Sequence, residues 1–173
     1  MVGNIFGVLI FTVLTVLRIQ QVLNGSWIAI LLALQSGIAV TLYFRRREAK
    51  KSAAPKTQIL AWTSALLPQA LSPHTSASPW LALFSVPGLL LAFWAMLALD
   101  RSFSIAPAKR EIVTRGPYKY MRHPMYAGEI LSLAGVLVSS LSLWNGAVFL
   151  LFFASVVWRI YEEGALIYGG SCG

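Results

Sequence analysis

The chain has 173 residues, of which 57% are hydrophobic and only 12% carry a charge. Soluble domains contain about 25% charged residues, so this composition excludes a water-soluble globular protein. The net charge of +8 does not indicate a nucleic-acid-binding protein, because a chain this apolar leaves no soluble basic face. A single cysteine excludes a disulfide framework and a cysteine-rich metal site, and we predict no metal.

Two uncharged stretches open the chain, and each predicts a membrane helix. The first runs from Met1 to Leu17, with no basic segment before it and no cleavage site of small residues after it. We therefore interpret it as a helix that stays in the membrane rather than as a signal peptide. The second stretch, Trp27 to Phe44, has 18 residues, close to the roughly 20 that span a bilayer.

Two basic segments, residues 45–56 and 101–122, each contain six lysines or arginines. Basic loops of membrane proteins stay on the cytoplasmic side. The 43 uncharged residues between Thr57 and Leu99 are long enough for two crossings, with a turn at Ser72–Pro79 and a short helix at Ile59–Leu71. Two crossings return both basic segments to one side, which we predict to be the cytoplasm.

The last apolar stretch, Ile130 to Trp158, has 29 residues. As one helix it would be about 43 Å long, against a hydrocarbon core of roughly 30 Å. The turn residues Ser142, Asn145 and Gly146 lie at its centre and favour a helical hairpin. A hairpin would return Arg159 and the acids that follow it to the cytoplasmic side, whereas a single kinked helix would not.

These patterns predict an all-α, multi-pass integral membrane protein with about four spans followed by a C-terminal helical hairpin. No repeat, low-complexity tract or strand pattern is found in the sequence. We therefore expect one structural domain.

Polar, aromatic and turn residues are dense between residues 112 and 129. Pro124 is suited to the first position of a helix, whose free backbone N–H groups would attract anions. Arg122 and His123 stand beside that helix end. An alternative interpretation is that the basic side chains reach lipid phosphates and that His123-Pro124 only separates two helices.

Further candidate residues follow in the hairpin. Arg159, Glu162 and Glu163 have the spacing of one helix face, which indicates either a binding cluster or an ordinary ion pair within a helix. Glu129 lies at the beginning of the last apolar stretch. An acid at the centre of a bilayer costs about 2.5 to 3.5 kcal/mol, and near the interface it costs less.

Three motifs follow one another in the last third of the chain: Gly116-Pro117-Tyr118, then Arg122-His123-Pro124-Met125-Tyr126-Ala127-Gly128, then Arg159 with Glu162-Glu163 and Leu166. In this order they resemble the isoprenylcysteine carboxyl methyltransferase family, which is grouped with phospholipid methyltransferases. The resemblance covers residues 112 to about 169. The N-terminal two thirds match only in being hydrophobic helices.

The resemblance implies an integral membrane enzyme that takes a methyl group from S-adenosylmethionine. The charge pattern predicts the transmembrane helices in residues 1–100. The resemblance implies a cytoplasm-facing cofactor-binding region, with the hairpin, in residues 101–173. By resemblance, Arg159 faces the substrate carboxylate as the catalytic residue. The residues matched to the cofactor are Ile112, Val113, Tyr118, His123, Pro124, Met125, Tyr126, Glu162 and Glu163.

A carboxylate that attacks a sulfonium methyl group needs alignment and removal of water, but no general base and no metal. An arginine can hold a carboxylate through two hydrogen bonds. Arg159 therefore favours a lipophilic carboxylate, such as an isoprenylcysteine-like substrate, whose apolar tail would enter from the bilayer among the membrane lipids. We expect no nucleic-acid partner.

Two departures from the family leave alternatives open. The family usually continues past the Leu166 position, whereas this sequence ends at Gly173, which would fit a truncated, non-catalytic homologue. The pattern Arg-His-Pro-x-Tyr-x-Gly-Glu, with Glu129 in its last position, also resembles membrane sterol reductases that use NADPH. The Glu162-Glu163 pair favours the methyltransferase.

Overall fold

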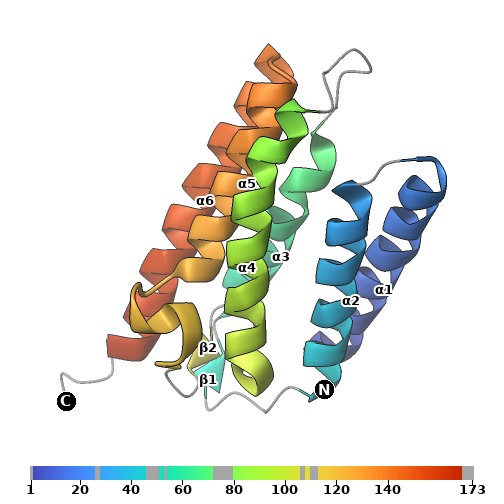
Figure 1. Ribbon diagram of the computed structural model, residues 1–173. Helices are drawn as coiled ribbons and strands as arrows, with labels where there is room; N and C mark the ends of the chain where they lie inside the picture. Colours follow the sequence, from blue (N-terminus) through green and yellow to red (C-terminus); the bar gives the residue numbers. More distant parts are fainter. Residues whose placement is uncertain are drawn as a thin grey trace.

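The computed structural model describes residues 2–25, 28–45, 51–52, 54–71, 80–105, 108–109 and 113–168. The α-helices in these ranges are α1 (Val2–Leu23), α2 (Ile28–Arg45), α3 (Pro55–Leu66), α4 (Val86–Leu99), α5 (Pro124–Ser139) and α6 (Leu143–Tyr168). Shorter 3-10 turns are η1 (Leu67–Ala70), η2 (Leu81–Ser85), η3 (Asp100–Ser102) and η4 (Gly116–Lys119). The six helices run up and down beside one another (Figure 1). The predicted all-α, multi-pass architecture is confirmed.

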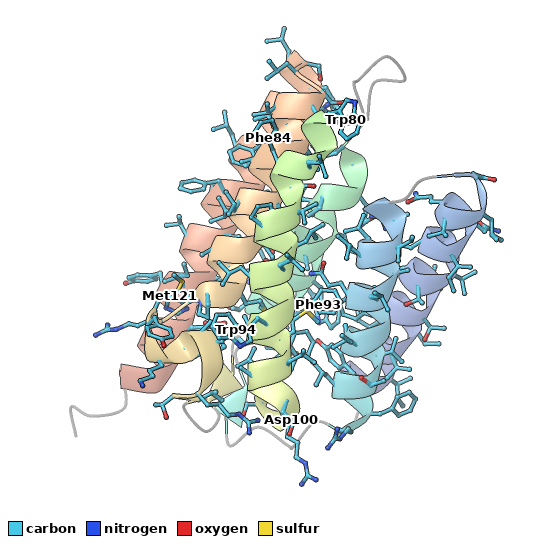
Figure 2. The ribbon with its side chains drawn as sticks, in the orientation of Figure 1. Trp80, Phe84, Phe93, Trp94, Asp100 and Met121 are labelled. Carbon is cyan, nitrogen blue, oxygen red and sulfur yellow. The ribbon has the colours of Figure 1, made fainter. Side chains whose placement is uncertain are left out.

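The chain is an integral membrane protein. Three segments are long and apolar enough to cross a bilayer, namely Ile5–Leu23, Leu83–Ser102 and Leu143–Ala165, and two shorter apolar helices accompany them. Large apolar side chains point outward around the bundle, as Trp80, Phe84 and Trp94 do in Figure 2. Because lipid tails are apolar, such an exterior is stable in a membrane and would be unstable in water.

The third helix differs in its bounds from the predicted Ile59–Leu71. The α-helix α3 begins earlier, at Pro55, and ends at Leu66, where η1 takes over. Pro68 lies in the first positions of η1. Since proline has no N–H and its ring clashes with a preceding helical turn, the regular α-helix stops before it. At 12 residues, or about 18 Å, α3 alone is shorter than a bilayer core.

The two basic segments lie at the same end of the bundle. A two-residue strand in the first segment, β1 (Lys51–Ser52), pairs antiparallel with a two-residue strand in the second, β2 (Ala108–Lys109). Figure 1 shows this pair at the end of the bundle where α2, α4 and α6 end and α1 begins. The predicted return of both segments to one end is therefore confirmed. The strand pair itself was not expected from the sequence.

The last apolar stretch is a hairpin, which excludes the single kinked helix. The chain turns at residues 140–142, slightly before the predicted centre, and Asn145 and Gly146 belong to the first turn of α6. The Ser142 hydroxyl oxygen accepts a hydrogen bond of 3.0 Å from the Asn145 backbone N–H. The Asn145 side-chain amide donates to the Ser140 carbonyl at 2.7 Å. These bonds satisfy polar groups that an apolar surrounding would otherwise leave unpaired.

Helices α4 and α5 pack backbone against backbone. A Cβ atom on Gly128 of α5 would lie only 2.5 Å from the Ala92 backbone nitrogen of α4. Added Cβ atoms on Gly88 and Gly135 would likewise overlap backbone atoms of the facing segment. Small residues allow this close approach, which is a main source of helix association in membranes. The contact fixes the direction of α5 and thereby the position of its first turn in the bundle.

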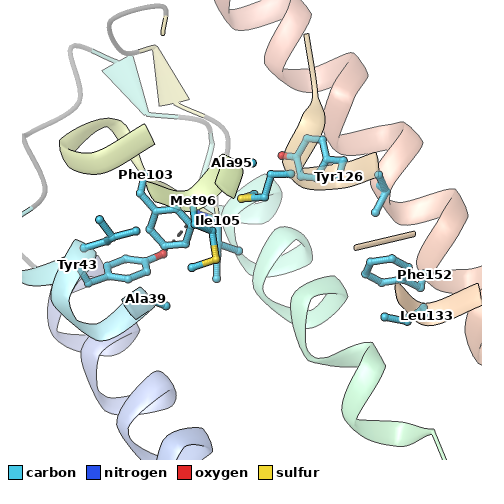
Figure 3. Packing of buried hydrophobic residues seen from close by; sticks show 12 residues of the cluster. Ala39, Tyr43, Ala95, Met96, Phe103, Ile105, Tyr126, Leu133 and Phe152 are labelled. Atoms are coloured by element: carbon cyan, nitrogen blue, oxygen red, sulfur yellow. Dashed lines mark hydrogen bonds between the residues drawn. The ribbon is translucent and has the colours of Figure 1, made fainter. Parts of the chain in front are cut away.

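The buried core continues from this pair toward the N-terminal helices. Figure 3 shows Tyr43 of α2 beside Phe103 and Ile105, with Tyr126, Leu133 and Phe152 further along the cluster. The Tyr43 ring meets the Phe103 ring edge to face, with centroids 5.5 Å apart. Further aromatic contacts join α1, α2 and α3 through Phe6, Phe11, Tyr43 and Trp62.

Candidate active site

Four polar side chains converge where α5 begins and α6 approaches its end: His123, Tyr126, Arg159 and Glu163. The Tyr126 hydroxyl donates a 2.5 Å hydrogen bond to Glu163 Oε1. His123 Nδ1 lies 3.8 Å from Glu163 Oε2, and the His123 ring stacks on the Tyr126 ring with centroids 5.7 Å apart. The Arg159 guanidinium carbon lies 4.8 Å from the Tyr126 ring centroid. Tyr126 is therefore the centre of the cluster.

The local sequence explains this convergence. Pro124 starts α5, and His123 immediately before it has non-helical backbone angles of φ −130° and ψ 57°. Because a residue before proline is disfavoured in helical conformation, the helix begins here. His123 and Tyr126 are three residues apart, and Arg159 and Glu163 are four apart, so each pair lies on one face. The hairpin then brings the two faces together.

Arg159 is the most unusual residue of the cluster. Only 1% of its surface is exposed, although it carries a permanent charge in a membrane helix. One terminal nitrogen, Nη2, donates a 2.8 Å hydrogen bond to the Ile105 carbonyl. Its Nε has no hydrogen-bond partner in the described part of the chain. A buried donor without a partner costs about 1 to 3 kcal/mol, so this nitrogen is a natural contact for a ligand.

The backbone of Ile105 connects this arginine to the N-terminal half of the protein. Its carbonyl accepts from Arg159, and its N–H donates a 3.4 Å hydrogen bond to the Tyr43 hydroxyl oxygen. Figure 3 shows Tyr43 and Ile105 side by side. Tyr43 is buried, with 1% of its surface exposed. The sequence does not mark Tyr43 or Ile105 as site residues, since no local motif reveals a contact between residues so far apart in the chain.

Tyr118 reaches the same region from η4. The preceding turn places Gly116 at a φ of +60°, which side-chain-bearing residues rarely adopt. Burial raises the pKa of the Tyr118 hydroxyl well above its ordinary value, and the negative charges of Glu163 and Glu129 raise it further. The protonated hydroxyl of Tyr118 is thus available as a hydrogen-bond donor beside the acids.

The other predicted site residues are placed as follows. Pro124 and Met125 are buried, and Met125 belongs to the hydrophobic core cluster. Glu162 and Val113 are partly buried. Ile112 and the chain end at residues 169–173 lie outside the described residues. The structure thus brings together His123, Tyr126, Arg159 and Glu163, with Tyr118 nearby.

A comparison with known protein families matches residues 80–168 to phospholipid methyltransferase. The matched region is slightly more than half of the chain and contains α4, α5, α6 and the whole polar cluster. The chain belongs to the phospholipid methyltransferase family. Membership of this family of membrane methyltransferases implies a methyl donor of the S-adenosylmethionine type, and it favours methyl transfer over NADPH-dependent reduction. Neither a comparison with curated proteins nor one with solved structures found a match.

Proposed function

We propose that this protein is an S-adenosylmethionine-dependent methyltransferase that methylates the carboxylate of a lipophilic, isoprenylcysteine-like acceptor. The observation that carries the proposal is the buried guanidinium of Arg159, whose Nε has no hydrogen-bond partner among the described residues. Arginine is the side chain best suited to hold a carboxylate through parallel hydrogen bonds.

The chemistry of the cluster fits the methyl donor. S-adenosylmethionine carries a carboxylate, an ammonium group and a cationic sulfur. The free N–H groups at the start of α5 suit the carboxylate, and the Glu163 carboxylate suits the ammonium group. His123 and Tyr126 would hold the methionine end between them, with Tyr118 as a further donor. When bound, the donor supplies an electrophilic methyl group.

The protein's own contribution is alignment and exclusion of water. Arg159 would orient the acceptor carboxylate, and its hydrogen bond to Ile105 and contact with the Tyr126 ring restrict the guanidinium to one position. Pre-set orientation of this kind supplies much of the barrier reduction in a transfer that needs no general base. The apolar exterior of α6 allows an acceptor tail to remain in the lipid.

The basic end of the bundle supports a cytoplasmic location for the site. Both basic segments lie at the end that carries His123 and Glu163, and basic loops remain in the cytoplasm. Their charge would also attract anionic membrane lipids.

A second candidate acceptor is the amine head group of a phospholipid. It is favoured by the family match, whose description names phospholipids as the methylated compounds. An amine would have to reach the methyl donor uncharged, because a protonated ammonium has no free electron pair.

The cofactor assignment is tested by isothermal titration of the detergent-purified protein with S-adenosylhomocysteine, with NADPH as a second ligand. We expect micromolar binding of S-adenosylhomocysteine and at least a ten-fold weaker affinity in Glu163→Gln and His123→Ala. Tyr161→Phe, which removes a hydroxyl from the exposed side of α6, should bind like the unchanged protein. Binding of NADPH alone would contradict the proposal and support a reductase.

The acceptor is tested by transfer of a labelled methyl group to an S-prenylated N-acetylcysteine and, separately, to phosphatidylethanolamine. A carboxyl methyl ester releases labelled methanol when treated with base, whereas a methylated amine does not. We expect base-labile label from the prenylated cysteine. Base-stable label on phosphatidylethanolamine alone would contradict the carboxylate acceptor and support the amine acceptor.

A further inference from the structure

Glu129 is an ionisable residue of the site for which the proposed function has no role. It follows Tyr126 by three residues on α5, so both side chains lie on the same helix face. Within the described part of the chain, its carboxylate has no hydrogen bond and no close ion pair. An acid on a membrane helix is costly and generally marks a functional position.

The charged groups of the site lie at two levels along the helices. Glu163 accepts a hydrogen bond from Tyr126 and lies near His123. These three residues form an outer level at the start of α5. Arg159 precedes Glu163 by four residues and Glu129 follows Tyr126 by three, so Arg159 lies about 6 Å and Glu129 about 4.5 Å further into the bundle. Glu129 interacts electrostatically with both Arg159 and Glu163. Arg159 and Glu129 thus form an inner level of opposite charges.

Binding of an anionic acceptor would unbalance this inner level. If Arg159 holds an acceptor carboxylate, one guanidinium faces two carboxylates, that of the acceptor and that of Glu129. Uncompensated charge is strongly unfavourable where water is excluded. A methyl group can be transferred only when its sulfur lies in line with the attacking oxygen, which brings one positive charge to the same level. The inner level is then neutral.

We propose that Glu129 is the counter-ion of the cationic sulfur of the methyl donor, and that it makes the site prefer the donor to the demethylated product. The inference rests on the proposed function. In the transfer, a bond forms between the acceptor oxygen and the methyl carbon, the carbon–sulfur bond breaks, and its electron pair stays on sulfur. The sulfonium becomes a neutral thioether and the carboxylate a neutral ester. The charges of Arg159 and Glu129 then balance each other. The neutral sulfur of the demethylated product is no longer attracted to Glu129.

The test compares two ligands that differ in this one charge. Dissociation constants for S-adenosylmethionine and S-adenosylhomocysteine are measured by isothermal titration with the full chain in lipid nanodiscs, without an acceptor. Glu129→Gln keeps the side-chain volume. We expect it to raise the dissociation constant of S-adenosylmethionine about ten-fold and that of S-adenosylhomocysteine less than two-fold. Asp100→Asn removes the same charge from the ion pairs with Arg45 and Arg115 and should change neither constant.

A second variant covers the case in which Glu129→Gln does not fold. Glu129→Asp keeps the charge and withdraws it by one methylene, so the preference for S-adenosylmethionine should fall by a smaller factor. Equal weakening of both ligands, or no change in their ratio, in whichever variant folds would overturn the inference while leaving the proposed cofactor site intact. Failure of the unchanged protein to bind either ligand would overturn the proposed function and this inference with it.

Discussion

The α4–α5 pair and the α1–α2 pair are held in the bundle by different kinds of contact. Between α4 and α5 the backbones themselves meet, at Gly88 and Gly128. Between α1 and α2 a glycine faces a side chain, because the space beside Gly7 is filled by the Tyr43 ring. A hydrogen bond of 3.0 Å from the Thr15 hydroxyl to the Ser36 hydroxyl adds to that contact.

The difference indicates where the protein needs fixed geometry. Backbone contacts cannot adjust, since no side chain can rotate to relieve an overlap. They support α5, which has His123 immediately before it and Tyr126 in its first turn. The N-terminal pair is joined to the rest mainly through aromatic rings, and it reaches Arg159 through the Ile105 backbone. It can therefore influence the site without forming it.

The largest effect is expected from Gly128→Leu. The new side chain would overlap the backbones of Gly88 and Ala92, and the helices could not remain in contact. We expect no monodisperse protein in detergent, or a thermal midpoint lowered by more than about 10 °C, because overpacking against backbone costs several kcal/mol. Gly146→Ala has open space around it and should behave like the unchanged protein. A stable Gly128→Leu protein that binds S-adenosylhomocysteine would show that the contact is dispensable.

A smaller and more specific effect is expected from Tyr43→Phe. The substitution keeps the ring in the core but removes the acceptor of the Ile105 N–H, so the Ile105 backbone that holds Arg159 can shift. We expect the KM for the carboxylate acceptor to rise about three- to ten-fold while the dissociation constant of S-adenosylhomocysteine stays within two-fold. An unchanged KM, or equal changes in both constants, would show that Tyr43 only fills the core. Tyr161→Phe is the matched control.

The smallest effect is expected from Gln69→Leu. Gln69 of η1 accepts an exposed hydrogen bond from Arg18 of α1, at the end of the bundle opposite the site. Exposed polar contacts contribute about 1 kcal/mol or less. The thermal midpoint should change by no more than about 3 °C, whereas Phe11→Ala, which removes a ring from the aromatic contacts, should lower it further. A larger loss in Gln69→Leu would contradict the view that rings hold the N-terminal pair.

The sequence was sufficient to predict the features that depend on neighbouring residues. Gaps between charges marked the helices, Pro124 marked the start of α5, and the polar residues near Asn145 marked a hairpin. The precise place of the turn was missed because Asn145 is used inside the first turn of α6, where its side chain bonds back to Ser140.

Contacts between distant segments could not be predicted. The meeting of Gly88 with Gly128 depends on the relative position of two helices, and no single-sequence pattern specifies that position. The bridge from Tyr43 to Arg159 passes through the backbone N–H and C=O of residue 105, so it depends on no particular side chain there. The pairing of β1 with β2 joins two-residue segments, which are too short to show an alternating pattern.

The glycine contact between α4 and α5 also limits how a lipid can travel to the site. Where two backbones touch, no acyl or prenyl chain can pass between them, so this side of α5 is closed from the bilayer over the length between Gly128 and Gly135. A membrane-dissolved acceptor of the kind proposed above would then have to approach Arg159 along another face of the bundle. The small residues that fix the helix would thus also determine from which side such an acceptor diffuses into the protein.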